Sequence, residues 1–225
     1  MKLAEALPQT YQVKPHVLHA LGLIARIEAD ASSSYADLCM RIAPNVAKSY
    51  TVTGEEHIPS SGPLIVVRNH PCHFDSMLLG TVFAVRPDVR PLMKMSPYTE
   101  GLPSDKVVFL RKVGPHAMPE DVAAMQQYLR AGGSMLAVPW GSMDHQAQDY
   151  ANPARAAKNA LRYASFGQAA VLPVTIDVER FADGTSFPVE HAEVNIHPAI
   201  MPTAEGLDEA AITARVTEMY ESYAY

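Results

Sequence analysis

Cysteine, tryptophan and long apolar runs are all scarce in this chain of 225 residues. The two cysteines, Cys39 and Cys72, are too few for a disulfide framework and fit a reducing compartment. No segment reaches the ~18 uninterrupted apolar residues of a membrane-spanning helix. The first residues also lack the apolar core of a signal peptide. We therefore expect a cytoplasmic protein that at most contacts a membrane peripherally.

Positive charge is also in short supply. Acidic residues number 24 against 18 lysines and arginines, which gives a formal net charge of −6 with histidine neutral. This balance argues against nucleic acid as a partner, and against membrane contact driven mainly by anionic lipid. Repeats, low-complexity tracts and Gly/Ser linkers are missing as well. Because 48% of the residues are hydrophobic, the length suits one α/β domain with a sizeable core.

The apolar stretches alternate in type along most of the chain. A β-branched and aromatic segment at residues 49–53 is typical of an edge strand. The patterns that follow predict strands at 64–68, 90–95, 106–111, 134–138, 170–176 and 191–197, and helices at 74–85, 119–131, 153–165 and 207–222. This alternation predicts an α/β fold with a mostly parallel central sheet flanked by helices.

A pair of helices is expected before this core. One is indicated by an apolar stripe in residues 16–29. The second should run from residue 34 to 42, capped by a serine of the run 32–34 and stopped by Pro44. We thus expect a single domain over residues 1–225, made of an N-terminal helical segment (1–48), a motif-bearing core (49–200) and a C-terminal helix (201–225).

The most informative local feature is the segment 69–75, in which His70 and Asp75 are separated by four residues. An apolar strand precedes it and an apolar helix follows, so His70 should lie at a strand-to-helix turn with Asp75 in the first helical turn. A carboxylate there can accept from one imidazole nitrogen and leave the other as a general base. This chemistry suits the deprotonation of a hydroxyl or an amine.

Each of these residues also has a simpler interpretation. Asp75 could merely stabilise the helix N-terminus, by about 0.3–1 kcal/mol, and His70 could be a satisfied histidine at a strand end. His70, His73 and Asp75 could bind a metal, but no further His or Cys cluster lies near them in sequence. Cys72 could be a nucleophile, although nothing marks it as a thiol of lowered pKa. We favour acid–base chemistry and expect no metal.

The surroundings of this pair resemble a known family. Residues 54–70 resemble the entry into the first motif of the PlsC-type (lysophospholipid/glycerolipid) acyltransferase superfamily, an Asn-His followed by four residues and Asp. Later blocks at 107–112, 132–142 and 171–176 follow in the family's order, and the resemblance covers about residues 50–200. It implies an acyltransferase of the lipid and phospholipid biosynthesis type, with acyl-CoA or acyl carrier protein as thioester donor and no cofactor.

The third block departs from the family pattern. The family reads Phe-Pro-Glu-Gly-Thr-Arg-Ser where this chain reads Val-Pro-Trp-Gly-Ser-Met-Asp at residues 138–144. In the family, that arginine and the basic residue of the second block are associated with the phosphate of the acceptor. Because Met143 cannot replace a bidentate guanidinium, we expect a lipid-like hydroxyl or amine acceptor other than glycerol-3-phosphate.

Several polar residues follow predicted strands, and ligands in parallel sheets bind at the carboxyl ends of the strands. Trp140 fits a pocket wall and a core residue equally well, and Gly141 fits a turn or an oxyanion site equally well. The loop 177–190 is the best candidate for an excursion near the site. The expected catalytic residues are His70 and Asp75, and the expected substrate-binding residues are Asn69, Arg111, Lys112, Trp140, Gly141 and Ser142.

Two other activities remain open on the sequence. The same His–Asp pair could activate water, which would make the protein a thioester or ester hydrolase. Alternatively, the fold could serve a non-catalytic acyl- or lipid-binding protein, as the altered third block suggests. Release of free acid without an acceptor distinguishes the first, and bound lipid without turnover of any thioester distinguishes the second.

Overall fold

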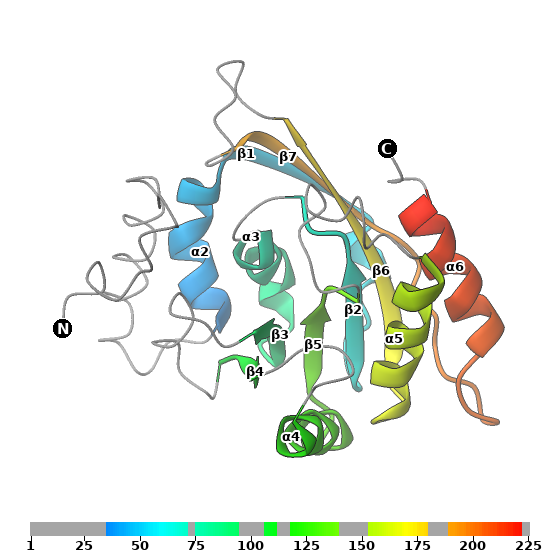
Figure 1. Cartoon of the computed structure of the whole chain (residues 1–225). Coiled ribbons are helices and arrows are strands. Elements are labelled where there is room, and N and C mark those ends of the chain that lie inside the picture. The colour runs from blue at the N-terminus through cyan, green and yellow to red at the C-terminus, as the bar shows by residue number, and fades with distance from the viewer. Residues whose placement is uncertain are drawn as a thin grey trace, which may run out of the picture.

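A seven-stranded sheet with helices on both faces forms the body of the protein (Figure 1). The computed structural model describes residues 35–71, 75–94, 106–111, 118–139, 153–179 and 189–221. The strands are β1 (Ala47–Thr53), β2 (Leu64–Arg68), β3 (Val89–Lys94), β4 (Val108–Leu110), β5 (Ser134–Ala137), β6 (Ala170–Glu179) and β7 (Val189–Ile196). The helices are α2 (Tyr35–Val46), α3 (Asp75–Val82), α4 (Pro119–Arg130), α5 (Pro153–Ser165) and α6 (Glu209–Glu221), with short 3₁₀ turns η2 (Glu55–His57) and η3 (Phe83–Val85).

The strands lie in the order β1-β7-β6-β2-β5-β3-β4. Neighbours run parallel except β6 and β7, which are antiparallel. Strand β2 lies in the middle, and all of its residues are buried, as expected for a strand covered on both faces. The predicted α/β fold with a mostly parallel sheet flanked by helices is therefore confirmed.

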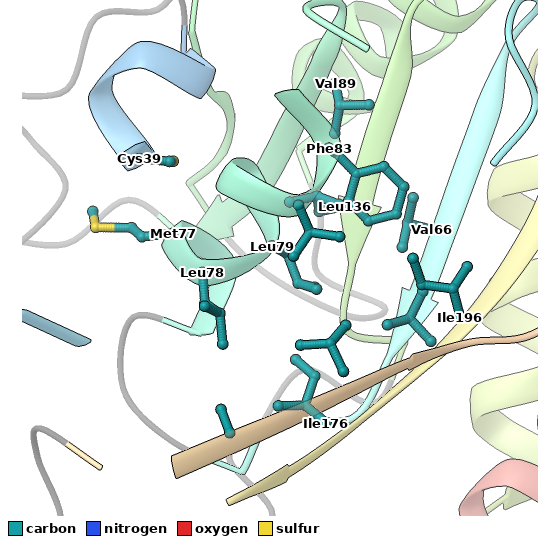
Figure 2. Close-up of a cluster of buried hydrophobic side chains, with 14 of the residues drawn as sticks. Cys39, Val66, Met77, Leu78, Leu79, Phe83, Val89, Leu136, Ile176 and Ile196 are labelled. Atoms are coloured by element: carbon teal, nitrogen blue, oxygen red, sulfur yellow. The ribbon is translucent and has the colours of Figure 1, made fainter. Parts of the chain in front are cut away.

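Two apolar clusters cover the two faces of the sheet because side chains alternate along each strand. Leu64 and Val66 of β2 pack with α2 and α3, whereas Ile65 and Val67 pack with α4, α5 and α6. Figure 2 shows part of the first cluster, in which side chains of α3 and η3 lie over the sheet. Helix α3 is thus packed on the same face of the sheet as Leu64 and Val66 of β2. Among the described helices, none combines the length and apolar character needed to cross a membrane.

Two boundary predictions were wrong. Helix α2 continues through Pro44 to Val46, so Pro44 lies inside the helix and does not stop it. The expected loop 177–190 is shorter, since residues 177–179 extend β6 and residues 189–190 begin β7. Glu179 pairs with His191 in the antiparallel ladder, so the strands extend into the segment expected to be a loop. The helix expected at 16–29, the serine cap and residues 180–188 lie outside the described residues.

Candidate active site

His70 and Asp75 meet at the turn between β2 and α3. β2 ends at Arg68, two residues before His70, and Asp75 is the first residue of α3. His70 Nδ1 lies 2.7 Å from Asp75 Oδ2. The Asp75 side chain is fully buried, whereas that of His70 is 23% exposed. The contact expected from the spacing is therefore present, and the imidazole can be reached from solvent.

The charge of Asp75 decides which imidazole nitrogen carries the proton. Burial alone would raise the pKa of Asp75, but the nearby charges of Arg68 and then His70, with hydrogen bonds from His70 and the Ser76 backbone, lower it overall. Asp75 is accordingly ionised at neutral pH, and an ionised carboxylate can only accept hydrogen bonds. His70 must donate through Nδ1–H, so that the lone pair of the neutral ring lies on Nε2.

Asn69 fixes the chain immediately before His70. Its side chain is fully buried, and its Nδ2 donates to the Ile176 carbonyl at 2.8 Å. The Ile176 N–H donates in return to Asn69 Oδ1, also at 2.8 Å. These bonds continue the β2–β6 ladder one step beyond the pair formed by Arg68 and Val174. Substrate contact was expected for Asn69. In the structure its side chain joins the turn to β6 through these two hydrogen bonds.

Arg68 is the site residue that sequence reasoning missed. It is only 4% exposed, and its Nη1 lies 2.7 Å from Asp75 Oδ1. The same nitrogen donates to the Asn69 carbonyl at 2.9 Å. From the far end of the chain, the Tyr220 hydroxyl donates to the Arg68 carbonyl at 2.6 Å. An arginine at the end of the otherwise apolar run 64–68 was the available signal.

Helix α2 supports the start of α3. The Tyr35 hydroxyl donates to the Ser76 carbonyl at 3.0 Å. Burial, and then the neighbouring Cys39, raise the pKa of Tyr35 well above its usual value. Burial also raises the pKa of Cys39 to about 12, so this thiol is unsuited to nucleophilic chemistry. Within the described part of the chain, no three His, Cys, Asp or Glu side chains are grouped so that they could hold a metal ion.

Arg111 follows β4 but is already engaged by acidic partners. Its backbone N–H and its Nε donate to the two carboxylate oxygens of Asp121, at 2.8 and 2.9 Å. Its Nη2 also donates to Glu120 Oε2 at 3.0 Å. Since β4 is three strands from β2, Arg111 is displaced from the His70 turn by about 14 Å across the sheet.

The other expected binding residues, Lys112, Trp140, Gly141 and Ser142, lie outside the described residues. The strand of the third block nevertheless ends beside the site, because β5 pairs with β2 in parallel and ends at Ala137. Asn159 of α5 then donates to the Pro139 carbonyl at 2.6 Å. The structure therefore brings together His70, Asp75, Asn69 and Arg68, and it leaves Arg111 apart from them.

This arrangement fits a family of enzymes that transfer acyl groups. Residues 49–177 match the model of the family described as Acyltransferase. The match spans more than half of the chain and includes the whole of the His70–Asp75 turn. The chain belongs to this acyltransferase family, as its resemblance to the PlsC-type superfamily predicted.

A solved structure shares the fold. It is the crystal structure of the 1-acyl-sn-glycerophosphate (LPA) acyltransferase, PlsC, from Thermotoga maritima. The similarity covers 92% of this chain and 78% of that chain, with a TM-score of 0.52 and 18% sequence identity. At this identity the similarity concerns the fold. No curated protein sequence matches the chain.

Proposed function

We propose that this protein transfers an acyl group from a thioester donor, acyl-CoA or acyl carrier protein, to the hydroxyl or amine of a lipid-like acceptor. The observation that carries the proposal is the 2.7 Å contact between His70 Nδ1 and buried Asp75. It lies in a chain of the acyltransferase family. His70 is the general base and Asp75 holds its tautomer.

The reaction needs no nucleophile from the protein, because a thioester is already activated. His70 Nε2 removes the proton of the acceptor, and the acceptor oxygen or nitrogen attacks the thioester carbonyl. Asp75 stabilises the imidazolium that forms. The tetrahedral intermediate then expels the thiolate, which takes the proton back from His70 and leaves as a thiol. General-base assistance of this kind contributes roughly 10²–10⁴-fold to the rate.

The oxyanion of the intermediate requires hydrogen-bond donors. Backbone N–H groups at the N-terminus of α3 are one source, because the positive end of the helix dipole lies there. Backbone N–H groups near Gly141 are the other source that we propose. No cofactor or metal takes part in the scheme, and the acyl thioester is a co-substrate.

The charges around Arg111 support an acceptor without a phosphate. A phosphate is bound best by a guanidinium whose paired N–H groups are available to donate to it. In this protein the Arg111 fork is taken by Asp121 and Glu120, which would also repel an anion. The similar protein of known structure is named for a phosphorylated acceptor. We propose that this chain differs from it and uses a less polar alcohol or amine.

We also propose that the protein acts in the cytoplasm, with at most peripheral membrane contact. The net charge of −6 gives little attraction to anionic lipid. A lipid-like acceptor would still require the site to reach a membrane surface or a carrier. The acyl carrier protein is the protein partner that the donor chemistry suggests.

The test supplies purified protein with acyl-CoA or acyl carrier protein and a panel of acceptors. The panel contains a long-chain alcohol, a long-chain amine, glycerol-3-phosphate and lysophosphatidic acid. We expect thiol release coupled to an acylated alcohol or amine, detected by mass spectrometry. His70→Ala should lose at least about 10²-fold in rate. His191→Ala is the matched control, because His191 lies on β7 and contacts Ser49 rather than the site.

Four results would contradict the proposal in different ways. Equal rates for wild type and His70→Ala would contradict the assignment of His70 as the general base. Free acid formed without any acceptor would indicate a hydrolase, and bound lipid without thioester turnover would indicate a binding protein. Preference for a phosphorylated acceptor would reject the proposed acceptor class alone.

A further inference from the structure

We propose that Arg68 is a positioning residue that fixes the charge and the orientation of Asp75, and through Asp75 the tautomer of His70. The inference rests on the proposed function, since it assigns a second support to the same general base. Arg68 itself touches neither the donor nor the acceptor in this scheme. Its effect passes entirely through the carboxylate.

The geometry divides the Asp75 carboxylate between two partners. Oδ1 lies 2.7 Å from Arg68 Nη1 and Oδ2 lies 2.7 Å from His70 Nδ1. The ion pair at Oδ1 and the contact at Oδ2 together restrain rotation about the Cβ–Cγ bond, so Oδ2 stays aimed at the imidazole. The Asn69 carbonyl takes a hydrogen bond from the same Nη1, which fixes the guanidinium against the chain that carries His70.

Arg68 is buried beside Asp75, whose opposite charge compensates its own. An isolated buried guanidinium is costly unless an opposite charge compensates it. Arg68 Nε has no hydrogen-bond partner within the described residues, and the contact to Asp75 Oδ1 is an ion pair without the alignment of a hydrogen bond. Packing alone would favour an apolar residue here, as at the preceding positions of β2.

Among the described residues, the other titratable groups beside Asp75, apart from Arg68 and His70, are uncharged at working pH. From α2 comes the Tyr35 hydroxyl, whose pKa is raised well above its usual value, chiefly by burial. Cys39, next to Tyr35, has its pKa raised to about 12 by burial. Arg68 from β2 is therefore the one permanent charge among the described groups that the pKa of Asp75 responds to. It keeps Asp75 ionised while His70 gains and loses its proton.

Removal of the charge should expose this role in the pH profile. In Arg68→Met, burial of Asp75 is no longer offset by the guanidinium, so its pKa rises. A protonated Asp75 cannot accept from His70 in the same way, and the acidic limb of kcat/KM should move to higher pH. We expect kcat at neutral pH to fall about 10–100-fold, the range for lost outer partners of a functional histidine, with little change in KM. Arg68→Lys keeps the charge and should restore the position of the acidic limb.

A matched control separates this effect from general damage. Arg86 is also 4% exposed, and it pairs with Asp88 and donates to the Gly62 carbonyl before β2. This is the opposite end of β2 from His70. Arg86→Met should lower the melting temperature and leave the acidic limb in place. An unmoved limb in a folded Arg68→Met would overturn the proposal.

A double variant keeps the test decisive if Arg68→Met does not fold. Arg68→Met/Asp75→Asn removes both charges and leaves neither one buried alone. If Arg68 acts through Asp75, kcat/KM of the double variant should equal that of Asp75→Asn within about twofold, since coupled residues are not additive. Independent, multiplicative losses would overturn the proposal.

A readout without substrate distinguishes this proposal from the proposed function. If wild type transfers no acyl group, the function fails, and the pH dependence of thermal unfolding still tests Arg68. Arg68→Met should lose less stability than wild type as the pH falls below about 4, because a raised Asp75 pKa lets the folded chain take up this proton no later than the unfolded chain does. The double variant should show the same acid profile as Asp75→Asn, since neither contains the Asp75 carboxylate. Identical acid profiles for wild type and Arg68→Met would overturn the role of Arg68.

Discussion

Gly80→Ala tests how α2 is held against the helix that begins at Asp75. Gly80 lies within α3. A methyl group added there would lie 2.3 Å from Cys39 Sγ, 2.7 Å from Tyr35 Cε1 and 2.9 Å from Cys39 Cβ. Both neighbours belong to α2 and are buried, with 0% and 3% of their surface exposed for Cys39 and Tyr35. Neither can swing into solvent, so α2 itself must move away from α3.

Two opposing terms set the size of the effect. Alanine favours a helix over glycine by about 1 kcal/mol. Overpacking a buried contact costs about 1–3 kcal/mol or more, and loss of the Tyr35–Ser76 hydrogen bond adds about 1 kcal/mol. We expect a net destabilisation of about 1–3 kcal/mol. For a protein of this length that lowers the melting temperature by about 2–4 °C per kcal/mol.

Thermal and urea unfolding would measure this loss. Gly80→Ala/Cys39→Ala removes the sulfur that the methyl group meets, so the double variant should recover about 0.5 kcal/mol or more relative to the sum of the single changes. Gly62→Ala serves as a comparison, because its methyl group would meet nothing within 4 Å and the cost comes from φ +84° alone. An unchanged or higher melting temperature for Gly80→Ala would refute the close packing of α2 on α3.

Two further changes test the turn and the charges. Asn69→Ala should lower the free energy of unfolding by about 1–3 kcal/mol for each Ile176 backbone group left unpaired, as measured by urea unfolding. It should also lower kcat in the transfer assay, and full activity would contradict the positioning role of Asn69. On acidification, stability should fall in two stages. The pKa of His197 is lowered from 6.5 by burial and by Arg215, so the unfolded chain takes up that proton first and the loss begins below about pH 6.5. The lowered pKa of Asp75 relative to 3.8 adds a second loss below about pH 4, and His197→Gln should remove the first stage from the melting curves.

The elements of the fold could be predicted because each has its own apolar period. β2 and α5 begin and end as expected, since one is a continuous apolar run and the other starts at a proline. The ladder between β6 and β7 could not be predicted, because its outer residues are polar and its register depends on the partner strand. Sequence alone also gives no strand order, which packing of distant segments decides.

The site too could be predicted from the sequence only in part. The spacing of His70 and Asp75 was enough to predict their contact, because a turn of known type joins a strand to a helix. The partner of Arg68 could not be predicted, since β2 could have placed its last side chain on either face. Arg111 was expected to bind a ligand, and only the structure shows that Asp121 from the following helix has already bound it.

The position of β1 at the edge of the sheet has a consequence for how the chain folds. Its neighbour in the described sheet is β7, and the paired residues Ser49 and His191 are 142 positions apart. β1 therefore cannot complete its backbone hydrogen bonds until almost the whole chain has been synthesised. Closing so long a segment slows folding. A chain that stops before β7 leaves β1 without its neighbour and β6 as an open edge, which favours aggregation over activity.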